Sequence, residues 1–184
     1  MPRLAARGLA LALGGVLAAC TSAPQVERDL GTSTREARIA LELAAADGPV
    51  AGRVTGLDAE PGRDVEARVL DVMADAVPAL AVRFKADGSA PPSPRLVVRH
   101  GAAPRANPCT AAAGEPASSL VTAAFCERER PIGAVSGRLA NADDAARTRL
   151  YRSLARALFP DLYAERYGIG SGPFRFDVQG NFGF

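Results

Sequence analysis

Two stretches of the chain repeat apolar residues at helical spacing, and each stretch repeats them on one face only. Between Asp58 and Val77 the repeat consists of Val65, Val69, Val72, Met73, Ala76 and Val77. Between Asn141 and Phe159 it consists of Leu150, Tyr151, Leu154, Ala157 and Leu158. A helix with a single apolar face has to bury that face against another layer. We therefore predict two helices that cover the same face of a sheet.

The second predicted helix has well-marked ends and a charged outer face. Asn141 or Asp143 can cap its first turn, and Pro160 ends it. Its outer face carries Arg149, Arg152 and Arg156. We expect this arginine stripe to be a solvated surface, and contact with anionic lipid headgroups is the alternative.

Short apolar runs elsewhere indicate strands. Leu96–Arg99 is typical of a central strand, and Leu80, Val82 and Phe84 alternate. The runs 120–126 and 132–139 predict a hairpin around the charged, solvated turn 127–130. The run 37–45 alternates Ile39, Leu41 and Leu43, which favours a strand, although its Ala and Leu content also suits a helix.

Asp47, Gly48 and Pro49 would turn that run into a second strand over 50–57, forming another hairpin. Together these elements predict an α+β fold. We expect a two-layer sandwich with a mostly antiparallel sheet of about four to five strands and two helices on one face.

The N-terminus has the order of a secretory signal. Arg3 and Arg7 precede an apolar run, Gly8–Ala19, which is shorter than the ~20 residues needed to span a bilayer. The run ends in Leu17-Ala18-Ala19-Cys20, which resembles the lipobox of bacterial lipoproteins. This resemblance implies cleavage before Cys20, acylation of Cys20 and insertion of the acyl chains into a lipid bilayer. With Thr21 next, it implies an outer-membrane anchor on the periplasmic side, and the inner membrane is the alternative.

The chain is accordingly expected to contain four parts. They are a lipoprotein signal peptide at 1–19, a flexible tether at 20–36, an α+β domain at 37–162 and a Gly/Phe-rich tail at 163–184. The net charge of +2 disappears when Arg3 and Arg7 are removed with the signal. A neutral domain lacks the basic excess of nucleic-acid-binding proteins, so we predict no nucleic-acid partner.

After acylation of Cys20, two cysteines remain, Cys109 and Cys126. An even pair in an exported protein favours a disulfide, and closing this loop would contribute about 3 kcal/mol. A metal site would need His100, the single histidine, and the resulting spacing matches no zinc pattern. Two free thiols are the third alternative. We predict the disulfide and no metal.

The tail alternates aromatic residues with polar or small ones near its end. This pattern indicates an edge strand or a segment that docks on the domain, and pairing with the sheet edge of an envelope protein is the alternative. The candidate partner contacts are Phe174, Phe176, Phe182 and Phe184.

Residues that could support catalysis are sparse. Ser136 sits one place too late for a G-x-S-x-G nucleophile elbow, and helix capping explains Asp143 and Asp144 more simply. We predict no catalytic residues and no cofactor.

The final helix ends in Leu158-Phe159-Pro160, and the order of elements loosely resembles small envelope lipoproteins of unknown function, which implies the architecture alone. We expect a non-catalytic binding or structural role in the cell envelope. A small-molecule or lipid carrier is the alternative, followed by an envelope hydrolase.

Overall fold

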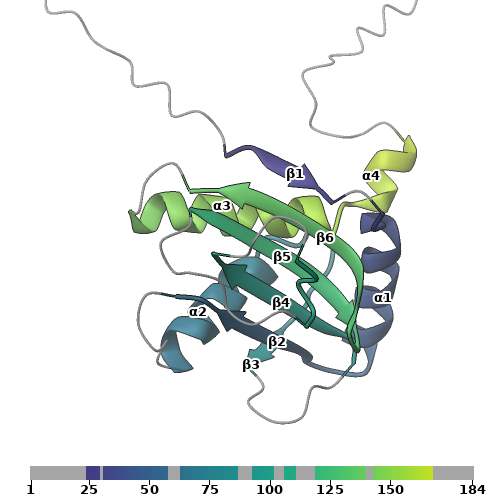
Figure 1. The fold of residues 1–184 in the computed structure, drawn as a ribbon. Coiled ribbons are helices and arrows are strands. Elements are labelled where there is room, and N and C mark those ends of the chain that lie inside the picture. Colours follow the sequence, from purple (N-terminus) through teal and green to yellow (C-terminus); the bar gives the residue numbers. More distant parts are fainter. Residues whose placement is uncertain are drawn as a thin grey trace, which may run out of the picture.

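The computed structural model describes residues 24–29, 31–57, 63–86, 93–101, 106–110, 119–139 and 143–167. The strands in these segments are β1 (Val26–Arg28), β2 (Val50–Thr55), β3 (Phe84–Ala86), β4 (Arg95–His100), β5 (Leu120–Glu127) and β6 (Arg130–Arg138). The helices are α1 (Thr34–Ala46), α2 (Arg63–Ala74), α3 (Asp144–Leu158) and α4 (Leu162–Tyr167). The strands form one sheet in the order β1-β6-β5-β4-β2-β3 (Figure 1).

The helices α1, α2 and α3 cover one face of this sheet. Alternate residues of the strands point toward them and are buried, among them Val54, Leu96, Val98, Ala123, Phe125 and Val135. The helices contribute Leu41, Leu70, Met73, Leu150, Leu154 and Leu158 to the same core. The predicted α+β class, with helices on one face of a sheet, is therefore confirmed (Figure 1).

The sheet is larger and more mixed than the sequence predicts. β4, β5, β6 and β1 pair antiparallel in succession, whereas β2 pairs parallel with both β3 and β4. The expectation of four to five mostly antiparallel strands is wrong. Between β2 and β3 lies α2, a crossover that returns the chain in the same direction and so makes the two strands parallel.

The stretch expected to be a strand over 37–45 is the helix α1, so the hairpin predicted with 50–57 is also wrong. Its buried residues follow helical spacing: Thr34, Ala37, Arg38 and Leu41. Ile39 and Leu43, which suggested a strand, are 43% and 69% exposed. The side chain of Ser33 caps the helix by accepting a hydrogen bond from the backbone N–H of Glu36 at 3.2 Å.

The limits of two other regions also differ from expectation. β1 lies inside the residues assigned to the tether, where Val26 pairs with Gly137 of β6. The strand expected over 80–84 begins only at Phe84, although Val82 and Phe84 are both buried. Alternating burial thus occurs there without strand pairing at 80–83.

The remaining elements follow the sequence closely. β4 lies between β2 and β5, and β5 and β6 form the predicted hairpin. α3 has Asp143 as its N-cap, whose side chain accepts a hydrogen bond from the N–H of Ala146 at 2.6 Å. None of the described helices is both long enough and apolar enough to cross a bilayer. Cys20 and the phenylalanines of the tail lie outside the described residues.

Gly133 allows α1 to approach β6 closely, and this suggests a first test. A Cβ atom at this position would lie 2.7 Å from Cβ of Ala37 and 3.2 Å from the carbonyl oxygen of Ser33. At Gly52 the nearest atom would be the Cδ2 tip of Leu70, at 2.6 Å, which can rotate aside. Gly133→Ala should therefore lower the free energy of unfolding by about 1–3 kcal/mol, and Gly52→Ala by less. Urea unfolding of both variants checks this, and an equal or reversed order would contradict the packing described for α1.

Candidate functional site

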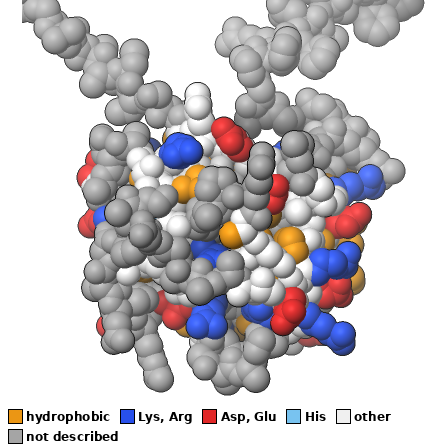
Figure 2. All heavy atoms as spheres, viewed as in Figure 1, with side chains coloured by type: hydrophobic (Ala, Val, Ile, Leu, Met, Phe, Trp, Pro, Cys, Tyr) orange, Lys and Arg blue, Asp and Glu red, His pale blue; other side chains and the backbone are white. Residues whose placement is uncertain are grey.

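The side of the sheet away from α1, α2 and α3, here called the helix-free face, carries most of the polar groups of the strands. Strand alternation places on it Arg53, Thr55, Arg95, Val97, Arg99, Thr122, Ala124, Cys126, Ala134 and Ser136. Figure 2 views the molecule from this side, and Lys and Arg side chains are visible near the middle of the view. The face divides into an apolar half and a polar half.

A segment that is held by a disulfide bridge covers the apolar half. Cys109 and Cys126 lie at disulfide distance, as predicted from the sequence, with their Cα atoms 5.8 Å apart. The bridge holds the segment 106–110 against β5, and the side chain of Asn107 donates to the carbonyl oxygen of Glu129 at 2.9 Å. A second apolar cluster results, separate from the main core, formed by Val97, Cys109, Ala124, Cys126 and Ala134. The segment is therefore fixed by a covalent bond, a hydrogen bond and apolar packing.

The polar half is a row of side chains that runs across four strands. Arg99 of β4 is paired with Thr55 on one side and with Thr122 on the other. Thr122 is paired with Ser136 of β6, and their hydroxyl oxygens are 2.9 Å apart. Directly paired residues on one face bring their Cβ atoms to about 5 Å, so these side chains are neighbours.

Arg99 is the unusual member of this row. Its side chain is almost completely buried, at 2% exposure, and no described residue accepts a hydrogen bond from its Nε or Nη1. Burial lowers the pKa of the Arg99 guanidinium from its ordinary value, but arginine remains charged at any physiological pH. Burial of an unpaired charge costs several kcal/mol.

Arg38, the other buried arginine among the described residues, shows the usual arrangement. It is 3% exposed, and its Nε donates to Oε1 of Glu42 at 2.6 Å. Its Nη1 donates to the carbonyl oxygen of Pro78 at 2.7 Å, which ties α1 to the segment that follows α2. Arg38 thus has a structural role. Among the described residues, Nε and Nη1 of Arg99 have no carboxylate or carbonyl acceptor comparable to those of Arg38.

Two further arginines make the helix-free face positive. Arg95 donates from Nη2 to the carbonyl oxygen of Cys109 at 3.2 Å, while its buried Nη1 has no described acceptor. Arg53, which is exposed, lies beside Val97 and so between Arg95 and Arg99. Strand alternation places no acidic residue on the helix-free positions of β2, β4 and β5. Glu27 of β1 is paired with Ser136, so an exposed carboxylate stands at the end of the row, three strands away from Arg99. The ion pairs found within the described segments lie elsewhere.

His100 lies on the opposite side of the sheet, in the core. Its Nε2 is 3.0 Å from the hydroxyl of Tyr151, and both residues are buried. The metal alternative required His100 to join Cys109 and Cys126, but the sheet separates His100 from that pair. Within the segments listed above, no group of three His, Cys, Asp or Glu residues could hold a metal ion.

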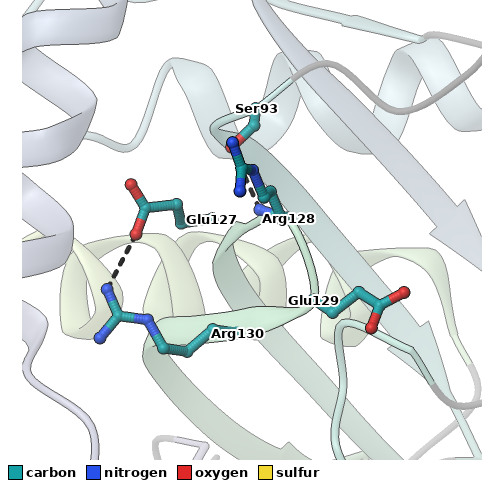
Figure 3. A pocket seen from close by; sticks show the side chains of 5 residues that line it. All are labelled: Ser93, Glu127, Arg128, Glu129 and Arg130. Atoms are coloured by element: carbon teal, nitrogen blue, oxygen red, sulfur yellow. Dashed lines mark hydrogen bonds and ion pairs between the residues drawn. The ribbon is translucent and has the colours of Figure 1, made fainter.

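A hollow of about 910 Å³ lies at the β5–β6 turn, but its lining does not suit a ligand (Figure 3). Its charged residues are the four of the turn, Glu127, Arg128, Glu129 and Arg130, and all are exposed. Glu127 and Arg130 pair with each other at 2.8 Å, and exposed pairs of this kind contribute little. The turn is therefore the solvated connector predicted from the sequence.

Sequence reasoning identified the cysteines of this face but missed its arginines and hydroxyls. Ser136 was considered only as a nucleophile, and in the structure its hydroxyl is bonded to that of Thr122. The available signal was Arg99 itself, a charged residue next to the apolar run 96–98 in a predicted central strand. Cys20, Phe174, Phe176, Phe182 and Phe184 were also predicted as functional, and they lie outside the described residues.

The disulfide should stabilise the fold measurably. Cys109 and Cys126 are separated by 17 positions, and opening a loop of this size should lower the free energy of unfolding by about 3 kcal/mol. Urea unfolding with and without a reducing agent measures the loss. The double variant Cys109→Ser/Cys126→Ser is the control, since its stability should not respond to the reductant. A wild-type protein equally insensitive to reduction would show that the bridge does not form.

Tyr151 should make stability depend on pH in the alkaline range. Burial, the largest effect, raises its pKa from 10.0 to about 12, while Arg147 lowers it and Asp144 raises it. Below pH 10 both states keep the proton. As the pH rises from 10 to 12 the unfolded chain loses it first, so the free energy of unfolding falls, by up to roughly 3 kcal/mol. Unfolding of Tyr151→Phe over this range should show a smaller decline, and an unchanged decline would contradict the assignment.

Comparison with known proteins finds no family model that matches the chain, and no similar curated protein or solved structure. A function for the chain therefore has to be inferred from its own residues, and the helix-free face presents the most unusual of them.

Proposed function

We propose that this protein is a lipid-anchored, non-catalytic binding protein of the bacterial cell envelope, and that the helix-free face is its binding surface. The anchor is Cys20, which follows the lipobox-like sequence Leu17-Ala18-Ala19. Acylation there would hold the domain beside a bilayer on the oxidising side of the membrane, at the outer membrane or, as the alternative, at the inner membrane.

The observation that carries the proposal is the segment 106–110 held against the sheet by Cys109 and Cys126. Disulfides persist mainly in exported proteins, so the pair supports a location outside the cytoplasm. The same bridge fixes the segment over Val97, Ala124 and Ala134, which lie two positions from Arg99, Thr122 and Ser136 on the same strands. The polar half of the face therefore adjoins a fixed segment. A fixed surface loses less conformational entropy on binding than a mobile one.

The hydrophobic core between the helices and the sheet is a weaker candidate for a binding site. Its described residues, such as Leu41, Leu70, Leu96, Phe125 and Leu154, are fully buried against one another. A carrier of small molecules or lipids would have to displace these contacts. The helix-free face has an exposed charged residue, Arg53, which a ligand can reach without such displacement, and this favours a surface-binding role over an enclosed carrier.

The anchor is tested by the variant Cys20→Ser in cells. It should no longer incorporate labelled palmitate, and the protein should move from the membrane fraction to the soluble fraction, because the thioether link to the lipid cannot form. Ser22→Ala, two positions along, is the control and should stay labelled. Persistent labelling of Cys20→Ser would refute the proposed anchor.

The binding surface is tested by a photo-crosslinking residue placed at Arg53 or, as the control, at Arg152. Both positions are exposed, but Arg53 lies on the helix-free face and Arg152 lies on α3 in the other layer. Irradiation of intact cells should give defined adducts from position 53 and none from position 152. Equal adducts from both positions would contradict a binding role for the helix-free face.

A further inference from the structure

We propose that Arg99, together with the hydroxyls of Thr122 and Ser136, binds the phosphate group of an anionic ligand on the helix-free face. The inference rests on the proposed function, since it concerns the same face, and it adds the chemical class of the ligand. It starts from the contrast between the two buried arginines. Arg38 has a carboxylate and a carbonyl as acceptors, whereas Nε and Nη1 of Arg99 have no described acceptor.

The donors of Arg99 match an oxyanion in geometry as well as in charge. Nε and a terminal nitrogen of a guanidinium lie side by side, and their two N–H groups can donate in parallel to two oxygens of one anion. That terminal nitrogen is Nη2, because Nη1 lies on the Cδ side of the guanidinium. An anion on the Nε/Nη2 edge would supply the acceptor that Nε lacks and would neutralise the buried charge. A neutral ligand would leave the charge uncompensated, so it fits the site less well.

The hydroxyl pair supplies a third donor. Thr122 and Ser136 are bonded to each other at 2.9 Å, so one hydroxyl hydrogen is used between them and the other remains able to donate. Thr122 is the direct neighbour of Arg99 across β4 and β5. Three donors from two directions suit the three terminal oxygens of a phosphate monoester, or three of the four oxygens of inorganic phosphate. A carboxylate has only two oxygens to offer.

The surroundings of Arg99 favour a single bound group over an extended polyanion. The side chain is 2% exposed, so an extended polyanion cannot lie along it, and a ligand would have to insert one small oxyanion to reach the guanidinium. Arg53 is exposed on the same face and lies beside Val97, two positions from Arg99 on β4. Its positive charge would attract an anion from solution toward the buried group.

The experiment uses the full chain in detergent micelles and measures the heat of binding of inorganic phosphate at fixed ionic strength, with chloride as the balancing anion. Wild-type protein should bind, and Arg99→Gln should bind at least ~10-fold more weakly, because a charge-assisted pair of hydrogen bonds is lost. Arg99→Lys should be intermediate, since it keeps the charge but not the fork. Arg152→Gln removes the same charge from α3 and should bind like the wild type.

A stability measurement in phosphate-free buffer separates a binding role from a structural one. Because the described residues offer Arg99 no acceptor, Arg99→Gln should be at least as resistant to urea as the wild type. A less stable Arg99→Gln variant would mean that the chain itself compensates this charge, and the proposal would be wrong. A folded wild-type protein without measurable phosphate binding would overturn it equally.

Vesicles distinguish a soluble ligand from a lipid headgroup that carries the same phosphate group. Wild-type protein is mixed with phosphatidylcholine vesicles with and without phosphatidic acid. Extra binding to phosphatidic acid that Arg99→Gln lacks would identify a lipid-borne phosphate, and binding of inorganic phosphate alone would identify a soluble ligand. Either result supports the site. If phosphate binding fails while crosslinks still form at position 53, the phosphate assignment is wrong and the binding surface stands.

Discussion

The bond between Cys109 and Cys126 determines what the helix-free face of the sheet can do. The opposite face is covered by α1, α2 and α3, and its residues are committed to the core. On the helix-free face the bridge holds the described segment 106–110 over Val97, Ala124 and Ala134. The row from Thr55 to Ser136 lies beside this covered area. Its hydroxyls and Arg99 therefore belong to a surface with a fixed edge.

The two buried arginines show how one residue type can serve two purposes in one fold. Arg38 pairs with Glu42 on α1 itself and links α1 to the segment that follows α2 through the carbonyl oxygen of Pro78. Among the described residues, Nε and Nη1 of Arg99 have no such acceptor, and the burial of these donors represents a cost to the folded state. Costs of this kind concentrate at functional sites, where the fold maintains an unfavourable arrangement because a ligand relieves it.

The sequence predicted those parts of the fold that depend on local patterns. α3 was recognised because its cap, apolar face and final proline agree, and the β5–β6 hairpin because its charged turn separates two apolar runs. α1 was mistaken for a strand because Ile39, Leu41 and Leu43 alternate, whereas only Leu41 of the three is buried. Which face of a segment is buried depends on its packing partners. An alternation of only three apolar residues is too short to reveal those partners.

The helix-free face was missed for a different reason, because its charge arises from strand pairing. Arg53 and Arg99 are far apart in a chain with a net charge of only +2, so composition indicated no basic surface and argued against a nucleic-acid partner. The parallel register of β2 and β4 places Arg53 beside Val97, between Arg95 and Arg99, and brings all three arginines onto one face. An antiparallel sheet, as first expected, would have joined β2 to other neighbours. The crossover through α2 is therefore what brings Arg53 beside the two arginines of β4 and makes this surface locally positive. The low net charge of the whole chain says little about the ligand that this surface can bind.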